Sequence, residues 1–252
     1  FRPHIPWYAP QKYFTLYPEK NVFLPKIKEN DLEDVPKPGQ YGIRKQWHKW
    51  LLDNNEWRGA IRGYLASISF ADAQVGRLLD ALDKSPHAKS TIIVLWSDHG
   101  MHIGEKQQWE KFTLFEEATR VPLIIVATGT TKAGTVCNRP VSLLDVYPTL
   151  NELCGLPVRE DLDGVSLVPL LKNPKAKWDR PSITTWGKGN HAARGQRYRY
   201  IRHPNGEEQL YDHKTDPDEF TNLADKPELA GVKERLAQWL PKTNANPVHN
   251  KK

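Results

Sequence analysis

Cysteine is scarce in this chain of 252 residues. There are two, Cys137 and Cys154, and they stand too far apart for a Cys-x-x-Cys metal site. Two cysteines are also too few for a disulfide framework. Each is therefore predicted to be a small buried residue. The cysteines leave the redox compartment undecided.

Long hydrophobic runs are absent as well. No stretch reaches the roughly 20 consecutive apolar residues that a membrane-spanning helix requires. The opening residues 1–6 lack the positive start and the longer apolar run of a signal peptide, and position 1 is not Met. We therefore expect a processed or truncated chain. Its 9 Trp, 9 Tyr and 7 Phe support a packed globular core.

The chain has no block of basic residues beyond Lys251 and Lys252 at its end, although its formal net charge is +6. The scattered lysines and arginines disfavour a nucleic-acid partner. Two interpretations of the charge stay open. It is either an ordinary basic surface or a positive field that concentrates anionic substrates near a cleft.

The hydrophobic pattern predicts an α/β fold with a mainly parallel sheet flanked by helices. Residues 56–84 have the three- and four-residue apolar spacing of a helix, and residues 91–96 and 121–126 are apolar runs typical of buried strands. A further helix is expected over 141–153, starting near Ser142. The first 55 residues are rich in proline and aromatic residues and are expected to form a packed, irregular arm with one short helix near residues 10–17.

The character of the chain changes after Pro174. Three short strand-like segments, 182–186, 196–202 and 208–211, precede an amphipathic helix over 227–240. This order predicts a small antiparallel sheet covered by one helix. We therefore divide the chain into a catalytic α/β part, residues 1–175, and a small C-terminal α+β subdomain, residues 176–252.

Asp98 and His99 stand where the first buried strand meets a loop, and Gly100 permits a sharp turn there. In open α/β sheets, ligands bind at the carboxyl ends of strands. An oxygen and a nitrogen ligand together suit a hard or borderline divalent cation. The alternative is a capping aspartate beside a surface histidine, which the position at the end of a buried strand makes less favourable.

Two further residues are candidates for chemistry. Lys111, amid Trp109, Phe112 and Phe115, can place a positive charge in a partly dry pocket for an anionic group. His4 lies on a stiff proline-flanked segment and can act as a general acid. A solvated lysine and a merely packed histidine are the alternatives. Weaker candidates of the same kind are His102, Lys106, His191 and Arg194.

Several short motifs occur in order along the chain. They are Arg2-Pro3-His4-Ile5-Pro6-Trp7, Ser97-Asp98-His99-Gly100, Gly104-Glu105, Trp109-Glu110-Lys111, Arg120-Val121-Pro122-Leu123-Ile124, Arg197-Tyr198-Arg199-Tyr200-Ile201, Glu208-Gln209-Leu210-Tyr211-Asp212, Asp216-Pro217 and Asn222-Leu223-Ala224. Together they resemble the second half of the sulfatase family, in the alkaline-phosphatase superfamily. The opening motif resembles the iduronate-2-sulfatase-like branch, and the last four resemble the C-terminal subdomain of the family.

The resemblance implies roles for these residues. Asp98 and His99 would bind calcium, Lys111 would contact the sulfate group, and His4 would contact the sulfate and help the leaving oxygen depart. It also implies an incomplete alkaline-phosphatase-like fold, a sulfated saccharide or similar sulfate ester as substrate, and an exported protein, whether periplasmic, extracellular or lysosomal. Substrate contacts are predicted for His102, Trp109 and His191.

The sequence departs from the family in three respects. The Cys/Ser-x-Pro-x-Arg motif that yields the formylglycine nucleophile is absent, and so are the paired aspartates that complete the calcium site. Lys106 stands where relatives often carry histidine. We therefore expect the isolated chain to be inactive, and an N-terminal sulfatase polypeptide to be a possible partner. A phosphoester or phosphonate hydrolase of the same superfamily and a non-catalytic glycan-binding or assembly module are the alternatives.

Overall fold

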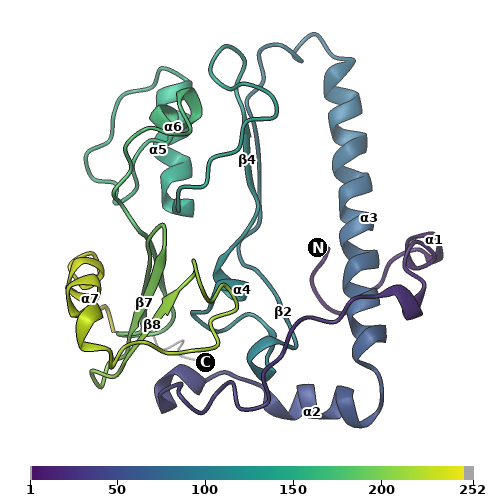
Figure 1. Cartoon of the computed structure of the whole chain (residues 1–252). Coiled ribbons are helices and arrows are strands. Elements are labelled where there is room, and N and C mark those ends of the chain that lie inside the picture. Colours follow the sequence, from purple (N-terminus) through teal and green to yellow (C-terminus); the bar gives the residue numbers. More distant parts are fainter. Residues whose placement is uncertain (1, 247–252) are drawn as a thin grey trace. The chain divides into compact units, whose positions relative to one another are not determined.

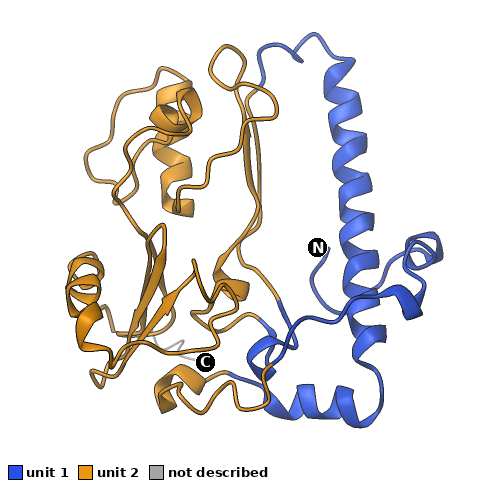
Figure 2. Cartoon of the chain, viewed as in Figure 1, with its two compact units in different colours: residues 1–27, 43–91, 102–110 blue, residues 28–42, 92–101, 111–252 orange. Residues whose placement is uncertain are grey.

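The computed structural model describes residues 2–246, which fall into two compact units (Figure 2). Unit 1 consists of the residues up to 27 together with 43–91 and 102–110. Unit 2 consists of residues 28–42, 92–101 and those from 111 onward. The subdomain boundary predicted near residue 176 lies inside unit 2 and stays a prediction.

Unit 1 is built on the helix α3 (Trp57–Asp83), which confirms the helix predicted over 56–84 (Figure 1). Its 27 residues correspond to about 40 Å of helix at 1.5 Å per residue. The N-terminal arm packs on this helix through aromatic rings. Trp7 and Tyr64 have ring centroids 5.8 Å apart, and Tyr13 and Phe70 have theirs 5.4 Å apart. The arm is therefore ordered by burial of its aromatic residues, as predicted.

Short elements complete unit 1. The arm contains α1 (Gln11–Phe14), where a short helix was predicted, and η1 (Glu19–Asn21). The helix α2 (Lys45–Asp53) was not predicted, because its segment reads as part of the irregular arm. The strands β2 (His102–Ile103) and β3 (Trp109–Glu110) pair antiparallel and flank η3 (Glu105–Gln107).

Unit 2 contains the two apolar strands expected from the sequence, β1 (Ile93–Trp96) and β4 (Leu123–Val126). They pair antiparallel, with Ile93 opposite Val126, so the predicted parallel direction is wrong for this pair. A parallel pair needs a crossover that carries the chain back along the sheet. The one α-helix between the two strands, α4 (Glu116–Thr119), has four residues and is too short for this purpose.

The two strands are also less buried than their apolar sequences predict. Leu95 is 39% exposed and Ile124 is 52% exposed. Both cysteines are exposed as well, so the prediction that they are buried is wrong.

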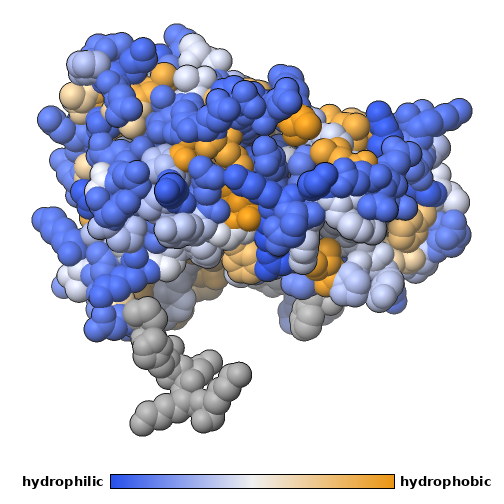
Figure 3. Space-filling view, turned by 90° about the horizontal axis from the view of Figure 1, so that it is seen from below, coloured by the Kyte–Doolittle hydropathy of each residue, from blue (hydrophilic) through white to orange (hydrophobic). Residues whose placement is uncertain are grey.

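Figure 3 shows hydrophilic residues over most of the face that it displays, with apolar residues in smaller groups among them. Of the helices that the structure describes, none is both long and apolar enough to span a membrane.

The rest of unit 2 begins with η2 (Lys37–Gln40) in the arm and continues with helices after β4. The predicted helix over 141–153 is present as η4 (Leu143–Asp145) followed by α5 (Val146–Leu153). Ser142 caps its start, and Asp145 bonds back to the Ser142 amide in a capping box. The short helix α6 (Val168–Lys172) follows.

The C-terminal part of unit 2 is an antiparallel sheet of four strands in the order β5-β6-β7-β8. The strands are β5 (Ser182–Thr185), β6 (His191–Arg194), β7 (Tyr198–Arg202) and β8 (Glu208–Asp212). The helix α7 (Ala230–Ala237), preceded by η5 (Pro227–Leu229), packs on β6 and β7. The predicted sheet and covering helix are therefore confirmed, although β6 was missed.

The core of this sheet predicts a clear stability difference. Leu210 is 0% exposed in the cluster with Ala193 and Tyr200, so Leu210→Ala removes buried methyl groups and leaves a cavity. We expect a loss of about 2–5 kcal/mol in the free energy of unfolding. Urea denaturation of the 252-residue protein measures it. The matched change Leu156→Ala, at a residue that is 55% exposed, should cost less than about 0.5 kcal/mol; equal losses would contradict the assigned core.

Candidate functional site

The metal-ligand candidates Asp98 and His99 lie in unit 2, one residue beyond the end of β1. The Nδ1–H of His99 donates a hydrogen bond to the Gly100 carbonyl, 2.7 Å away. Its Nε2 lies 3.9 Å from Oδ1 of Asp98. The Asp98 side chain is 75% exposed and that of His99 is 33% exposed. The two side chains therefore present one carboxylate and one ring nitrogen side by side at the end of the strand.

This arrangement fits a divalent cation. A histidine ligand commonly donates its other ring N–H to a backbone carbonyl, which fixes the tautomer and leaves the second nitrogen for the metal. The bond from Nδ1 of His99 to Gly100 has this form. Two ligand atoms 3.9 Å apart can share one ion, because calcium–ligand distances are about 2.3–2.6 Å. Calcium usually takes 6–8 ligands, mostly oxygen, so a calcium ion at this pair would need further ligands.

Gly100 is required by a close approach of backbone to backbone. Its N–H donates to the Ala118 carbonyl of α4 at 2.8 Å. A Cβ atom at position 100 would lie 2.0 Å from the Glu117 carbonyl oxygen and 3.0 Å from that of Arg120. The glycine was predicted for its freedom to turn. The structure instead shows that no side chain fits between this loop and α4.

Lys111 lies in unit 2 and lines the same cavity as Asp98 and His99, whose volume is about 1180 Å³. Its ammonium nitrogen is 5.2 Å from the centre of the Phe112 ring. Phe112 has φ 56°, so the backbone turns sharply directly after the lysine. The same cavity is lined by Arg120, Arg139, Arg194 and Arg199. Its cations therefore outnumber its acidic side chains, which suits an anionic ligand.

His4, the candidate general acid, lies in unit 1 and is exposed. Its Nδ1–H donates to the carbonyl of Ile5 at 2.5 Å, so the proton transfer predicted for His4 would have to use Nε2. The role predicted for His4 stays a prediction.

Two predicted substrate contacts, His102 and Trp109, are buried in unit 1, with exposures of 0% and 3%. They lie on the paired strands β2 and β3. The indole N–H of Trp109 donates to Nδ1 of His48 at 3.3 Å. Burial favours a packing role for both residues, and their contact with substrate stays a prediction. Lys106, one of the weaker candidates, is 3% exposed.

The third predicted contact, His191, lies on β6 and is 3% exposed. Its Nδ1 is 2.8 Å from the hydroxyl of Thr185, and its Nε2 is 2.8 Å from the side-chain oxygen of Asn244. Both ring nitrogens are therefore engaged within unit 2. This favours a structural role for His191, and its contact with substrate also stays a prediction.

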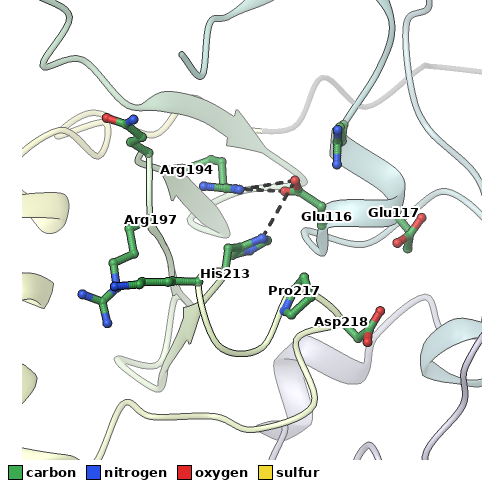
Figure 4. A pocket seen from close by; sticks show the side chains of 10 residues that line it. Glu116, Glu117, Arg194, Arg197, His213, Pro217 and Asp218 are labelled. Atoms are coloured by element: carbon green, nitrogen blue, oxygen red, sulfur yellow. Dashed lines mark hydrogen bonds and ion pairs between the residues drawn. The ribbon is translucent and has the colours of Figure 1, made fainter. Parts of the chain in front are cut away.

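A group of five charged or ionisable side chains was not recognised in the sequence, where Arg194 alone was named as a weaker candidate. We call it the α4 charge cluster: Glu116, Arg194, Arg199, His213 and Glu219 (Figure 4 shows three of its members). Figure 4 shows the side chains of Arg194 and His213 directed at the carboxylate of Glu116. The members come from α4, β6, β7 and the segment after β8. No local motif could reveal the cluster, because its members are far apart in the sequence.

The charges of the cluster depress the pKa values of its two acids. Burial alone would raise the pKa of Glu219, but the Arg199 charge and a hydrogen bond from His213 outweigh burial and hold the pKa at about 2. Burial opposes the effect at Glu116 too, where the Arg199 charge and the hydrogen bond from Arg194 lower the pKa. Both carboxyls are therefore ionised at neutral pH.

Two models of known protein families match the chain. The family model described as Sulfatase matches residues 2–156, more than half of the chain. A second model, described as N-sulphoglucosamine sulphohydrolase, C-terminal, matches residues 104–246. The chain belongs to the sulfatase family.

Individual relatives agree with this assignment. A sulfatase of Formosa agariphila is 42% identical over 247 residues, which are 97% of this chain and 48% of that protein. Choline-sulfatase of Rhizobium meliloti is 33% identical over 233 residues, 89% of this chain and 45% of that protein. Human iduronate 2-sulfatase is 35% identical over 183 residues, 67% of this chain and 33% of that protein. The chain spans about half or less of the length of these relatives.

Solved structures share the fold. The phosphonate monoester hydrolase of Silicibacter pomeroyi superposes with a TM-score of 0.79 at 24% identity, covering 94% of this chain and 53% of that one. A protein solved in complex with its substrate D-glucosamine-2-N,6-O-disulfate gives a TM-score of 0.74 at 23% identity, covering 94% of this chain and 62% of that one. The incomplete alkaline-phosphatase-like α/β fold predicted from the sequence is thereby confirmed.

The contact at Gly100 predicts that one substitution has opposite effects at two positions. Gly100→Ala forces the loop away from α4 and should destabilise the protein by about 1–3 kcal/mol. Gly76→Ala, inside α3 with nothing within 4 Å of the new Cβ, should stabilise it by about 0.5–1 kcal/mol. Urea denaturation of both variants tests the contact. A neutral Gly100→Ala would contradict it.

The depressed pKa of Glu219 predicts a loss of stability in acid. Its pKa in the folded state is about 2 against an ordinary value of 4.5, so the stabilisation is complete above pH 4.5 and is lost as the pH falls toward 2. The loss is about 3 kcal/mol, at 1.36 kcal/mol per pKa unit. We would measure the free energy of unfolding of the wild type and of Glu219→Gln at pH 7, 4.5 and 3. The difference between the two proteins should shrink as the pH falls. The exposed Glu234→Gln should keep the wild-type slope; a constant gap for Glu219→Gln would oppose this explanation.

Proposed function

We propose that the protein to which this chain belongs hydrolyses sulfate esters, with a sulfated saccharide or similar ester as substrate and water as co-substrate. The observation that carries the proposal is the cavity of unit 2, which brings Asp98 and His99 together with Lys111. The family assignment supports the same reaction. We further propose that the protein is exported, as the resemblance implies.

Each residue has a chemical role in this proposal. Asp98 and His99 would hold calcium, and the bound ion would supply positive charge beside the sulfate oxygens. The ammonium group of Lys111 stabilises the negative charge that develops on those oxygens as the ester bond breaks. His4 in its protonated form donates a proton to the leaving alcohol oxygen. The products are then an alcohol and inorganic sulfate.

The nucleophile has to come from outside these 252 residues. A formylglycine requires the motif Cys/Ser-x-Pro-x-Arg, which the sequence does not contain. We therefore propose that the isolated chain does not turn over sulfate esters. An N-terminal sulfatase segment, in the same polypeptide or as a separate one, would supply the nucleophile and the remaining calcium ligands.

The deciding experiment measures desulfation by the full-length protein on a panel of sulfated saccharides. We expect Lys111→Ala to lower kcat/KM about 100- to 1000-fold, because it removes a charge that stabilises the transition state. Asp98→Asn should weaken calcium binding about 10- to 100-fold. His4→Ala should lower kcat, because the leaving oxygen then has no proton donor.

Matched controls are available on the surface. Lys175→Ala and His87→Ala change exposed residues that do not line the cavity and should leave activity unchanged. Full activity in both Lys111→Ala and His4→Ala would show that the site assignment is wrong. Assays with paired phosphate and phosphonate monoesters address the alternative reaction. Faster turnover of those esters than of sulfate esters would favour a phosphonate or phosphoester hydrolase.

A further inference from the structure

We propose that Arg199 and Glu219 of the α4 charge cluster are positioning residues for the site, acting on Lys111 and on the pair Asp98 and His99 through α4. The inference rests on the proposed function for the identity of the site. Neither residue needs to touch the substrate for this role. They fix the backbone segments that carry Lys111, Asp98 and His99, the side chains proposed to contact the substrate and the cation.

The anchor is the guanidinium group of Arg199, which is 1% exposed. Its Nε donates to Oε1 of Glu219 at 2.5 Å, and its Nη1 donates to the Leu114 carbonyl at 3.1 Å. Its Nη2 donates to the carboxylate of Glu116. A planar guanidinium holds several acceptors in one fixed geometry, which a lysine ammonium does not. Arg199 therefore ties β7 to the chain at two points just before and within α4.

These bonds are close to Lys111 along the chain. Leu114 and Glu116 follow the lysine by three and five residues. Of the residues between Lys111 and Glu116, those at positions 113–115 are buried. The N–H of Glu116 also donates to Oε2 of Glu219 at 2.8 Å. The first residue of α4 is thus held by both its backbone and its side chain. The backbone of Lys111 is therefore five residues from a point that is fixed in two ways.

The other end of α4 holds the metal-ligand pair. The Ala118 carbonyl accepts the N–H of Gly100 at 2.8 Å, and the Glu117 carbonyl oxygen lies only 2.0 Å from where a Cβ of Gly100 would be. Gly100 is adjacent to His99. A displacement of α4 therefore moves the loop of Asp98 and His99 together with the segment of Lys111. One short helix connects the cation-binding and the anion-binding parts of the site to the C-terminal sheet.

A second metal site is the main alternative explanation of the cluster. Glu116, His213 and Glu219 each offer one ligand atom, and these atoms lie within 4.8 Å of one another. However, Arg199 already bonds to both carboxylates and supplies one of the two positive charges that balance them. Arg194 adds a second guanidinium, 3.0 Å from Glu116. The cluster is therefore balanced by the side chains of the protein, which favours a positioning role.

The first test follows the Gly100 amide by hydrogen exchange in the 252-residue protein without ligand. Arg199→Met should lower the protection of this amide at least tenfold, because α4 loses its anchor. Arg199→Lys keeps the charge without the fork and should give a smaller loss. The control is Lys233→Met, which removes another cation of the C-terminal region, paired with Glu208 at 2.7 Å. It should leave the Gly100 amide as in the wild type.

The second test uses sulfate-ester hydrolysis by the full-length protein and a double-mutant cycle. Arg199→Lys should lower kcat about tenfold or more, and most of this loss should disappear in the Lys111→Ala background. A residue that supports only overall stability would give the same factor in both backgrounds. Lys233→Met should leave kcat and KM unchanged. The Arg199→Lys variant keeps the test valid if Arg199→Met does not fold.

The outcomes separate this inference from the function on which it rests. Unchanged activity in Lys111→Ala would remove the proposed site itself. A strong effect of Lys111→Ala with an equal, independent effect of Arg199→Lys would leave the site intact and overturn the positioning role. Unchanged Gly100 protection in both Arg199 variants would overturn it as well.

Discussion

The contact between Gly100 and α4 is the constraint on which the arrangement of the site depends. The Glu117 carbonyl lies 2.0 Å from the position that a Cβ would take, and the Ala118 carbonyl accepts the glycine N–H. The loop after β1 and the helix α4 are thereby joined by contacts between their backbones. One carries Asp98 and His99 and the other follows Lys111, so the candidate cation ligands and the candidate anion contact line one cavity.

Buried charge fixes the other side of α4. Removing ions from water is costly, and the cost is recovered only where partners with good geometry satisfy them. Arg199 at 1% exposure and Glu219 at 2% meet this condition, because each makes several directed bonds. An apolar contact of the same size could slide, whereas these bonds have one arrangement. The C-terminal sheet is in this way tied to the part of the chain that carries the site.

The pattern of apolar residues along the sequence correctly predicted α3, the two apolar strands, the C-terminal sheet and its covering helix. It could not give the direction of β4 against β1, which the path of the connecting chain decides. It missed β6, which is four residues long and has no alternation, and α2, which lies in a proline-rich arm. The roles of Asp98 and His99 were predicted from their place at the end of a strand, and they stay a prediction. The partners of Arg199 were not, since 83 and 20 residues separate it from Glu116 and Glu219.

The exposure of the proposed metal-ligand pair, Asp98 and His99, explains why backbone contacts matter at this candidate site. A side chain that is 75% exposed, such as that of Asp98, cannot be held by packing, because its neighbours on most sides are water. Its position then depends on its backbone and on the few bonds of adjacent residues. The bond from Nδ1 of His99 to Gly100 and the bond from Gly100 to Ala118 supply these restraints. A binding site can therefore stay open to a ligand while its geometry is set by residues beneath it, and this division between exposed ligands and buried anchors is what gives α4 its importance.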